Sequence, residues 1–355
     1  MKRILELELP PGWFVLVLVG FLCRLNPAAA ATAGQYLKEK DAWFHTPEAR
    51  RIADNILTWQ APAGDWPKNG DTVSQPYIGD TNKLHGTFDN GATTGEIRFL
   101  ARAYNATRDA RYQAAALKGI DHLLAAQYPT GGWPQYSPPP AKTYHRYITF
   151  NDNAMVRVLE TLRQVATSAE FDFVDQPRRS AAQKAFDRGI ACILRCQISV
   201  NGKLTVWCAQ HDEKDFSPRP ARKFELVSLS GAESAGILHL LMTIESPSPE
   251  ERRAIQAGAA WFAAAKITGL RQTHVEGNKV IVADSNAPAL WARFYDIQTG
   301  RPIFSGRDSV PKYTLAEIEA ERRNGYAWYG PWGEAVARDY AAWSQKWLSP
   351  PAKMP

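Results

Sequence analysis

The chain has 355 residues, of which 45% are hydrophobic, so it is long enough to bury a large core. Its formal net charge of +6 favours a polyanionic partner, but 36 acidic residues are interspersed with the 42 basic ones, which argues against a nucleic-acid partner. Four cysteines are too few for a disulfide scaffold.

The first 31 residues are expected to be a signal peptide. Lys2 and Arg3 precede an apolar run at 13–23, and small residues follow at 28–31. The apolar run is too short to span a bilayer as a helix. We therefore expect cleavage near residue 31, a secreted or periplasmic protein without stable membrane association, and one domain over residues 32–355. An uncleaved anchor is the alternative.

One motif occurs three times: an apolar helical segment that ends in Gln, then a turn with Gly, then a Trp. The three occurrences are QAPAGDW (60–66), QYPTGGW (127–133) and QISVNGKLTVW (197–207). The segments TFDNGA (87–92), TFNDNA (149–154) and SLSGA (228–232) follow them and open the next helices. A repeat that carries a helix pair predicts stacked pairs that bury one another's apolar faces. We therefore expect an all-α fold, an (α/α)₃ toroid of three helix-pair repeats.

Apolar residues at a spacing of three to four predict the helices. In chain order these are 35–59, 90–105, 109–127, 152–168, 179–196, 230–245 and 248–267. A long connection is expected at 61–89, and after residue 268 long aromatic loops with a few short strands. Asn201 and Gly202 predict a hairpin turn that would bring Cys196 and Cys208 close enough for one disulfide, with Cys192 left unpaired.

Asp89 and Asp152 open helices of two repeats, at positions that we take as equivalent, so they would converge at one end of the helix array. Each could be an ordinary helix N-cap. As a pair, they could instead bind a hard cation such as Ca²⁺, or serve as acid and base in glycoside hydrolysis.

Arginines are concentrated in the expected loops, at Arg219, Arg222, Arg293, Arg301 and Arg307. Loop arginines are usually solvated, but a cluster of them with Lys223 would bind carboxylates through bidentate hydrogen bonds. Trp133 and the other Trp residues beside turns could stack on sugar rings or pack in the core.

Nine strings carry a family resemblance. They are GDWPKN (64–69), TFDNGATTGEIRFLARAY (87–104), GGWPQY (131–136), YHRYITFNDNAMVRVL (144–159), WCAQHD (207–212), SLSGAES (228–234), WARFYDI (291–297), RPIFSGRD (301–308) and NGYAWYGPW (324–332). In this order the chain resembles polysaccharide lyase family 10, the secreted bacterial pectate lyases with an (α/α)₃ toroid. The strings span most of the chain between about residues 35 and 333.

The resemblance implies an enzyme that cleaves α-1,4-linked polygalacturonate by calcium-assisted β-elimination and forms 4,5-unsaturated oligogalacturonides. It assigns the catalytic base to Arg222 and the Ca²⁺ ligands to Asp152 and Asp89. It assigns substrate binding to Asp89, Asn90, Arg293 and Arg307. We also expect Lys223, Trp133 and Tyr329 to bind substrate. Two residues depart from the family pattern: Asn153, where Asp or Gly is expected, and Tyr147, where His is expected.

Two other functions stay open. An α/α-toroid glycoside hydrolase would use Asp89 and Asp152 as acid and base, act without calcium and leave a saturated product. A non-catalytic protein would bind uronate without forming any product. For each function we expect a monomer.

Overall fold

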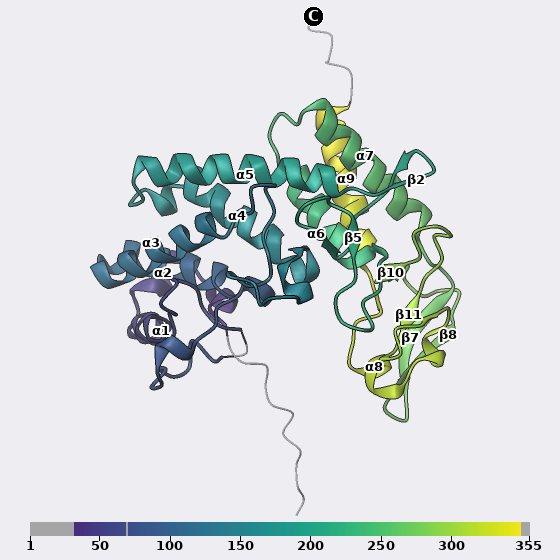
Figure 1. The fold of residues 1–355 in the computed structure, drawn as a ribbon, viewed down its shortest axis with the longest axis horizontal. Helices are drawn as coiled ribbons and strands as arrows, with labels where there is room; N and C mark the ends of the chain where they lie inside the picture. The colour runs from purple at the N-terminus through teal and green to yellow at the C-terminus, as the bar shows by residue number, and fades with distance from the viewer. Residues whose placement is uncertain (1–31, 69, 349–355) are drawn as a thin grey trace, which may run out of the picture.

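The structure is a computed structural model that describes residues 32–68 and 70–348 (Figure 1). The expected signal peptide, residues 1–31, lies outside this part of the chain. Among the described helices, none has the length and apolar character needed to cross a bilayer.

Helices dominate the described chain. They are α1 Pro47–Thr58, α2 Thr94–Thr107, α3 Ala110–Ala125, α4 Ala154–Thr167, α5 Gln176–Cys196, α6 Gly231–Met242, α7 Pro249–Ala264, α8 Ala320–Asn324 and α9 Trp332–Trp347. The region 35–59 contains the short 3-10 helices η1 Ala33–Tyr36 and η2 Asp41–His45 before α1. Helix α9 lies where we expected loops, and it buries Val336 and Trp343.

The helix pairs stack in two rows. Helices α2, α4 and α6 pack against one another in sequence, and α3, α5 and α7 form a parallel second row. Helix α1 packs on α2 and α3, and α9 packs on α6 and α7 (Figure 1). The expected repeat of helix pairs is confirmed, and closure of the rows into a toroid stays a prediction.

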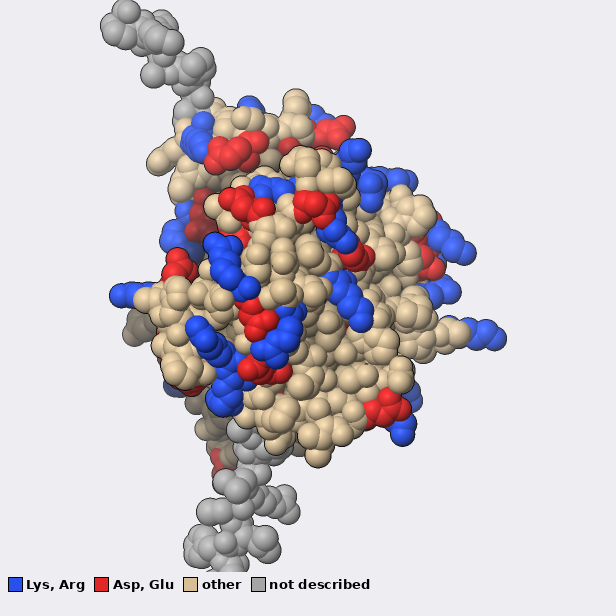
Figure 2. All heavy atoms as spheres, turned by 90° about the vertical axis from the view of Figure 1, so that its left-hand side faces the viewer, with Lys and Arg blue, Asp and Glu red and all other residues tan. Residues whose placement is uncertain are grey.

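Ion pairs link neighbouring helices at the surface. Arg111 on α3 pairs with Asp54 on α1 at 3.0 Å, and Arg178 on α5 pairs with Asp121 on α3 at 2.7 Å. Figure 2 shows basic and acidic side chains interspersed on one face of the molecule. The positive charge is therefore not gathered into a stripe on that face.

The three Trp residues of the repeat close the joints between helix pairs. Their indole N–H groups donate at 2.8 Å to backbone carbonyls near the end of the preceding helix, namely Trp66 to Ile56, Trp133 to Leu123 and Trp207 to Ile193. All three side chains are fully buried. Trp133 therefore has no ring face available to a sugar, and its expected role in substrate binding is wrong.

The Gln residue of each repeat joins its turn to the next outer helix. Gln197 Nε2 donates to the carbonyl of Thr205 at 2.9 Å and to that of Ala254, on α7, at 3.0 Å. Gln60 and Gln127 make the equivalent pairs of hydrogen bonds. In the second turn, Gly131 has a φ of +98°, and a Cβ there would lie 2.3 Å from the Arg188 carbonyl oxygen, so only glycine fits.

Short antiparallel strands hold the loops. They are β1 Ile148–Thr149, β2 Ser199–Val200, β3 Lys203–Leu204, β4 Gln210–His211, β5 Pro218–Arg219, β6 Leu229–Ser230, β7 Leu270–Val275, β8 Asn278–Ala283, β9 Trp291–Ala292, β10 Phe294–Tyr295, β11 Phe304–Ser305, β12 Pro311–Lys312 and β13 Tyr329–Gly330. Strand β10 pairs with β6, and β9 pairs with β13. These two pairings fix the segment around residue 293 beside the start of α6.

The predicted hairpin is confirmed, but the disulfide is not. Strands β2 and β3 pair across Asn201 and Gly202, which both have positive φ. Cys192, Cys196 and Cys208 are nevertheless free and buried. The Sγ atom of Cys208 contacts the Arg219 carbonyl at 3.6 Å, and burial raises the pKa of the Cys196 thiol. Cys192 and Cys208 both contribute to the raised pKa of Cys196, yet no bond joins Cys196 to Cys208, so the expected disulfide is not formed.

The repeat joint predicts a stability effect. Replacing Gln197 by Ala leaves two carbonyls without their donor and should lower the free energy of unfolding by about 1–3 kcal/mol in chemical denaturation. Gln183→Ala is the control, because Gln183 makes only an exposed hydrogen bond to Asp187. Equal effects of both substitutions would contradict the role of the joint.

Candidate active site

Two short 3-10 turns, η4 Asp89–Gly91 and η6 Asn151–Asn153, precede α2 and α4. Asn90 has a φ of 53° and Asp152 a φ of 49°, so these two residues are equivalent, whereas Asp89 corresponds to Asn151. The equivalence of Asp89 and Asp152 that we expected is wrong by one residue. The N-cap positions belong to Thr93 and Asn153, so neither aspartate caps its helix.

Backbone pairing between successive repeats brings these turns together. The amide of Phe88 donates to the Gln135 carbonyl at 3.1 Å, and the amide of Phe150 donates to the Ala209 carbonyl at 2.9 Å. Each helix-opening segment is thereby paired with the chain that follows the Trp of the next repeat. As a result, η4 contacts η6, and η6 contacts α6.

Asp89 is buried and holds two polar side chains. Its Oδ2 accepts hydrogen bonds from Lys68 Nζ and from Gln135 Nε2, the latter at 2.7 Å. Burial lowers the pKa of Lys68, but the hydrogen bond and charge of Asp89 outweigh this effect and raise it. Sequence reasoning missed Lys68 and Gln135, although both stand two residues after a repeat Trp.

Asp152 belongs to a charged cluster at the start of α6. Arg293 Nη2 donates to Asp152 Oδ1 at 3.0 Å and also to Glu233 Oε1. Arg293 and Glu233 are buried, whereas the Asp152 side chain is 35% exposed. Arg157 Nη1 also donates to the Asp152 carbonyl at 2.5 Å, so two guanidinium groups lie beside the two carboxylates. Asp152 is the partly exposed carboxylate of the two and therefore the one that a bound cation can reach.

The backbone of Arg293 is held on both sides. Its amide donates to the Trp328 carbonyl at 2.7 Å, and its carbonyl accepts from the Gly231 amide at 2.8 Å. Burial lowers the pKa of Arg293, but the charges of Glu233, Tyr326 and Asp152 outweigh this and raise it. Arg293 therefore stays protonated and serves as a fixed positive charge.

Arg222 lies on the loop between β5 and β6. Glu225 accepts from its Nε at 2.8 Å and also from its Nη2, and this pairing raises the pKa of Arg222. The Tyr326 hydroxyl donates to Glu225 at 2.8 Å, and the guanidinium lies 5.6 Å from the Tyr326 ring centroid. The Arg222 side chain is 42% exposed and that of Arg293 only 8%, so Arg222 is the more accessible of the two arginines.

Tyr144 lies near both Lys68 and Arg222. Burial raises the pKa of Tyr144, and the charges of Arg222 and Lys68 partly offset this rise. Burial and the charge of Lys68 lower the pKa of the adjacent His145, so this ring is neutral at neutral pH. Lys68 and Arg222 therefore flank one short stretch of chain.

The remaining expected substrate residues differ in position. Asn90 and Lys223 are exposed. The Tyr329 ring packs 5.3 Å from that of Phe304, and burial raises its pKa to about 12. Arg307 pairs with Glu321 at 3.0 Å on the exposed segment after β11, outside the cluster. The structure therefore brings Asp89, Asp152, Arg222 and Arg293 into one region and leaves Arg307 apart.

The described residues contain no group of three His, Cys, Asp or Glu side chains that would ligate a metal unaided. The Oδ1 atoms of Asp89 in η4 and of Asn151 in η6 nevertheless have no hydrogen-bond donor among the described residues. The Oδ1 atom of Asn153 has none either, but it packs against Gly236 of α6. Carboxylate and amide oxygens are what Ca²⁺ prefers, and it takes about six to eight of them. The residues thus fit a cation that is shared with a bound ligand.

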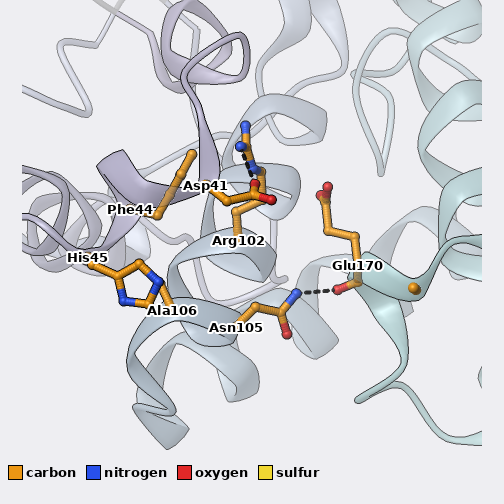
Figure 3. A pocket seen from close by; sticks show the side chains of 8 residues that line it. Asp41, Phe44, His45, Arg102, Asn105, Ala106 and Glu170 are labelled. Atoms are coloured by element: carbon orange, nitrogen blue, oxygen red, sulfur yellow. Dashed lines mark hydrogen bonds and ion pairs between the residues drawn. The ribbon is translucent and has the colours of Figure 1, made fainter.

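A separate cavity of about 350 Å³ lies at the other end of α2 (Figure 3). There Arg102 pairs with Asp41 at 2.7 Å and stacks on Phe44, and Asn105 donates to the Glu170 carbonyl at 2.8 Å. The polar groups of these residues pair with one another, and the cavity lies at the opposite end of α2 from Asp89.

Comparison with known proteins identifies the class. The sequence profile of the family described as pectic acid lyase matches residues 60–337. Two solved structures of the family 10 polysaccharide lyase from Cellvibrio cellulosa are similar to the chain. One, a mutant in complex with trigalacturonic acid, has a TM-score of 0.77 and 36% identity over 88% of this chain and 96% of that one. The other has a TM-score of 0.75 and 35% identity over 88% and 95%.

A search of the curated proteins found no match. The family match covers more than half of the chain, and it agrees with the order of the nine strings. The chain belongs to the pectic acid lyase family, the family 10 polysaccharide lyases.

A buried carboxylate behind the site gives a pH-dependent prediction. Thr72 donates to Glu96 Oε1 at 3.1 Å, and burial raises the pKa of Glu96 to about 7. The raised value means that its stabilising effect is complete below the unfolded pKa near 4.5 and is lost as the pH rises through about 7.

Glu96→Gln should therefore remove a decrease of roughly 3 kcal/mol in the free energy of unfolding between these two pH values. Denaturation of both proteins across this range measures the difference. The exposed Glu250→Gln variant is the control and should follow wild type. Parallel curves for wild type and Glu96→Gln would show that Glu96 does not titrate as described.

Proposed function

We propose that this protein is a pectate lyase that cleaves α-1,4-linked polygalacturonate by β-elimination and releases 4,5-unsaturated oligogalacturonides. The observation that carries the proposal is the grouping of Lys68, Arg222 and Arg293 around Asp89 and Asp152 in a member of this family. A relative with 36% identity is seen in complex with trigalacturonic acid.

The proposed reaction removes the C5 proton of a galacturonate residue and expels the oxygen at C4. Charge develops on the carboxylate next to C5, so fixed cations that face this carboxylate lower the barrier. Arg293 suits this role because Glu233, Asp152 and two backbone hydrogen bonds hold it in place. Lys68, held by Asp89, would bind a carboxylate of a neighbouring sugar residue.

Arg222 is our proposed base. A base must be neutral to accept a proton, but the nearest charged partner of Arg222 is Glu225, which raises its pKa. The neutral form therefore becomes more abundant only at high pH, and we propose an alkaline optimum. Binding of a uronate would compete with Glu225 for the guanidinium and free it to face C5.

Calcium is part of the proposal. Asp152 would hold the ion, with Asp89 and the amide oxygen of Asn151 as further oxygen donors. When bound, Ca²⁺ would neutralise the substrate carboxylate and acidify the C5 proton. Asn153 adopts a left-handed conformation, φ 61°, which Gly or Asn tolerates best, so its departure from the family pattern keeps the backbone geometry.

Export after removal of residues 1–31 and a monomeric state complete the proposal. Both agree with a polymeric substrate found outside the cell, and both are accessible by sizing and by N-terminal sequencing of the exported protein.

The reaction type can be tested by ultraviolet absorbance. We expect the purified protein to produce a calcium-dependent rise with polygalacturonate at alkaline pH, because elimination creates a C4–C5 double bond conjugated to the carboxylate. A chelator should abolish the rise. Reducing ends without absorbance would indicate the hydrolase alternative, and binding without any product would indicate the non-catalytic one.

Replacing the base should separate turnover from binding. Arg222→Ala should lower kcat by about 10²- to 10⁴-fold, the usual contribution of a general base, and change the affinity for trigalacturonate much less. Arg301→Ala, in a loop and stacked on Tyr313, is the control with unchanged kcat. Wild-type kcat in Arg222→Ala would refute the assignment.

The pH profile supplies a second readout. Glu225→Gln removes the carboxylate that raises the pKa of Arg222, so the rise of kcat with pH should move toward lower pH. An unmoved profile in a folded variant would mean that Glu225 does not control the ionisation of the base.

A further inference from the structure

A second cavity, of about 830 Å³, adjoins the site. This volume is within the roughly 300–1,000 Å³ that is typical of small-molecule sites. Loop residues within three segments line it: 61–65, 82–86 and 136–140.

The cavity lies beside the proposed active site at Tyr136, which lines it. This residue follows Gln135, whose side chain donates to Asp89. The Tyr136 ring lies 5.0 Å from that of His145, and its charge acts on the pKa of Lys68. A polysaccharide that passes Lys68 would therefore enter the cavity along the Tyr136 ring.

The chemistry of the cavity differs from that of the active site. Its lining contains neither Lys nor Arg, whereas Lys68, Arg222 and Arg293 surround the proposed catalytic position. Its walls are the ring of Tyr136, Leu84 and the prolines 138–140, which suit the C–H faces of a pyranose ring.

The only carboxylate in this lining is Asp65, which is 2% exposed. Its Oδ2 lies 3.5 Å from Nε2 of the buried His122, and its Oδ1 has no hydrogen-bond donor among the described residues. Lys118 acts on Asp65 from outside the lining. A uronate carboxylate placed in the cavity would lose water and would meet neither Lys nor Arg in the lining, which is unfavourable.

We propose that this cavity is a subsite for an uncharged, methyl-esterified galacturonate residue, located beside the ionised residues at the active site. The inference rests on the proposed function and names a finer substrate class for it, partly methyl-esterified pectate. An ester removes the charge and adds a methyl group that fits the proline-lined wall.

The test compares kcat/KM on fully de-esterified polygalacturonate with kcat/KM on pectate of low methyl esterification. We expect wild type to use the esterified polymer at least as well. His85→Arg places a cation in the exposed wall of the cavity and should shift the preference toward the de-esterified polymer by about two- to fivefold. His45→Arg, the same substitution at the other end of α2, should leave the preference unchanged.

Mass spectrometry of the products gives an independent readout. The proposal predicts methyl esters at one fixed distance from the new unsaturated end or from the new reducing end. Esters at random positions, or a preference that His85→Arg does not move, would overturn the subsite. If no unsaturated product forms even from polygalacturonate, the proposed function itself fails, which separates the two failures.

Discussion

The contact on which the site depends is the buried guanidinium of Arg293 between Asp152 and Glu233. It joins three distant parts of the chain: the turn that opens α4, the first turn of α6 and the loop segment between β9 and β10. A buried charge is costly unless it is paired, and each partner here would be left unpaired without the others. The contact therefore ties the geometry of the helix array to that of the loops.

The helix array explains why charged groups from different repeats meet. Each repeat ends in a buried Trp. The chain after Trp133 pairs with the segment that opens α2, and the chain after Trp207 pairs with the segment that opens α4. In this arrangement Lys68 and Gln135 both donate hydrogen bonds to the carboxylate of Asp89. The core thus fixes positions, while the exposed loops supply Arg222, the one arginine of the group that is half exposed.

Much of the fold followed from the sequence because helix periodicity and the repeated Gln, Gly and Trp residues are local signals. These signals do not fix where a helix begins. Helix α2 begins four residues later than expected because Asn90 and Thr93 adopt positive φ. Helix α9 was missed although Val336, Tyr340, Trp343 and Trp347 recur at a spacing of three to four, because it lies in a region without a repeat. The β2–β3 hairpin was predicted because an Asn-Gly turn fixes it locally.

The site was predicted less completely, for a physical reason. Asp89, Asp152, Arg222 and Arg293 came from motifs, but their partners depend on packing across repeats. Glu233 and Glu225 looked like ordinary helix and loop acids, yet they hold the two arginines. Trp133 was assigned to the site although it belongs to the core. A Trp beside a turn can pack in a core or stack on a sugar, and the side chain of Trp133 is fully buried.

A crystal structure of the wild-type protein with trigalacturonate, obtained at acidic pH to suppress turnover, tests the central claim most directly. The account predicts uronate carboxylates facing Arg293 and Lys68, with the Arg222 guanidinium moved from Glu225 toward C5 of a sugar residue. Trigalacturonate bound away from these residues, or an Arg222–Glu225 pair unchanged beside a bound sugar, would contradict it.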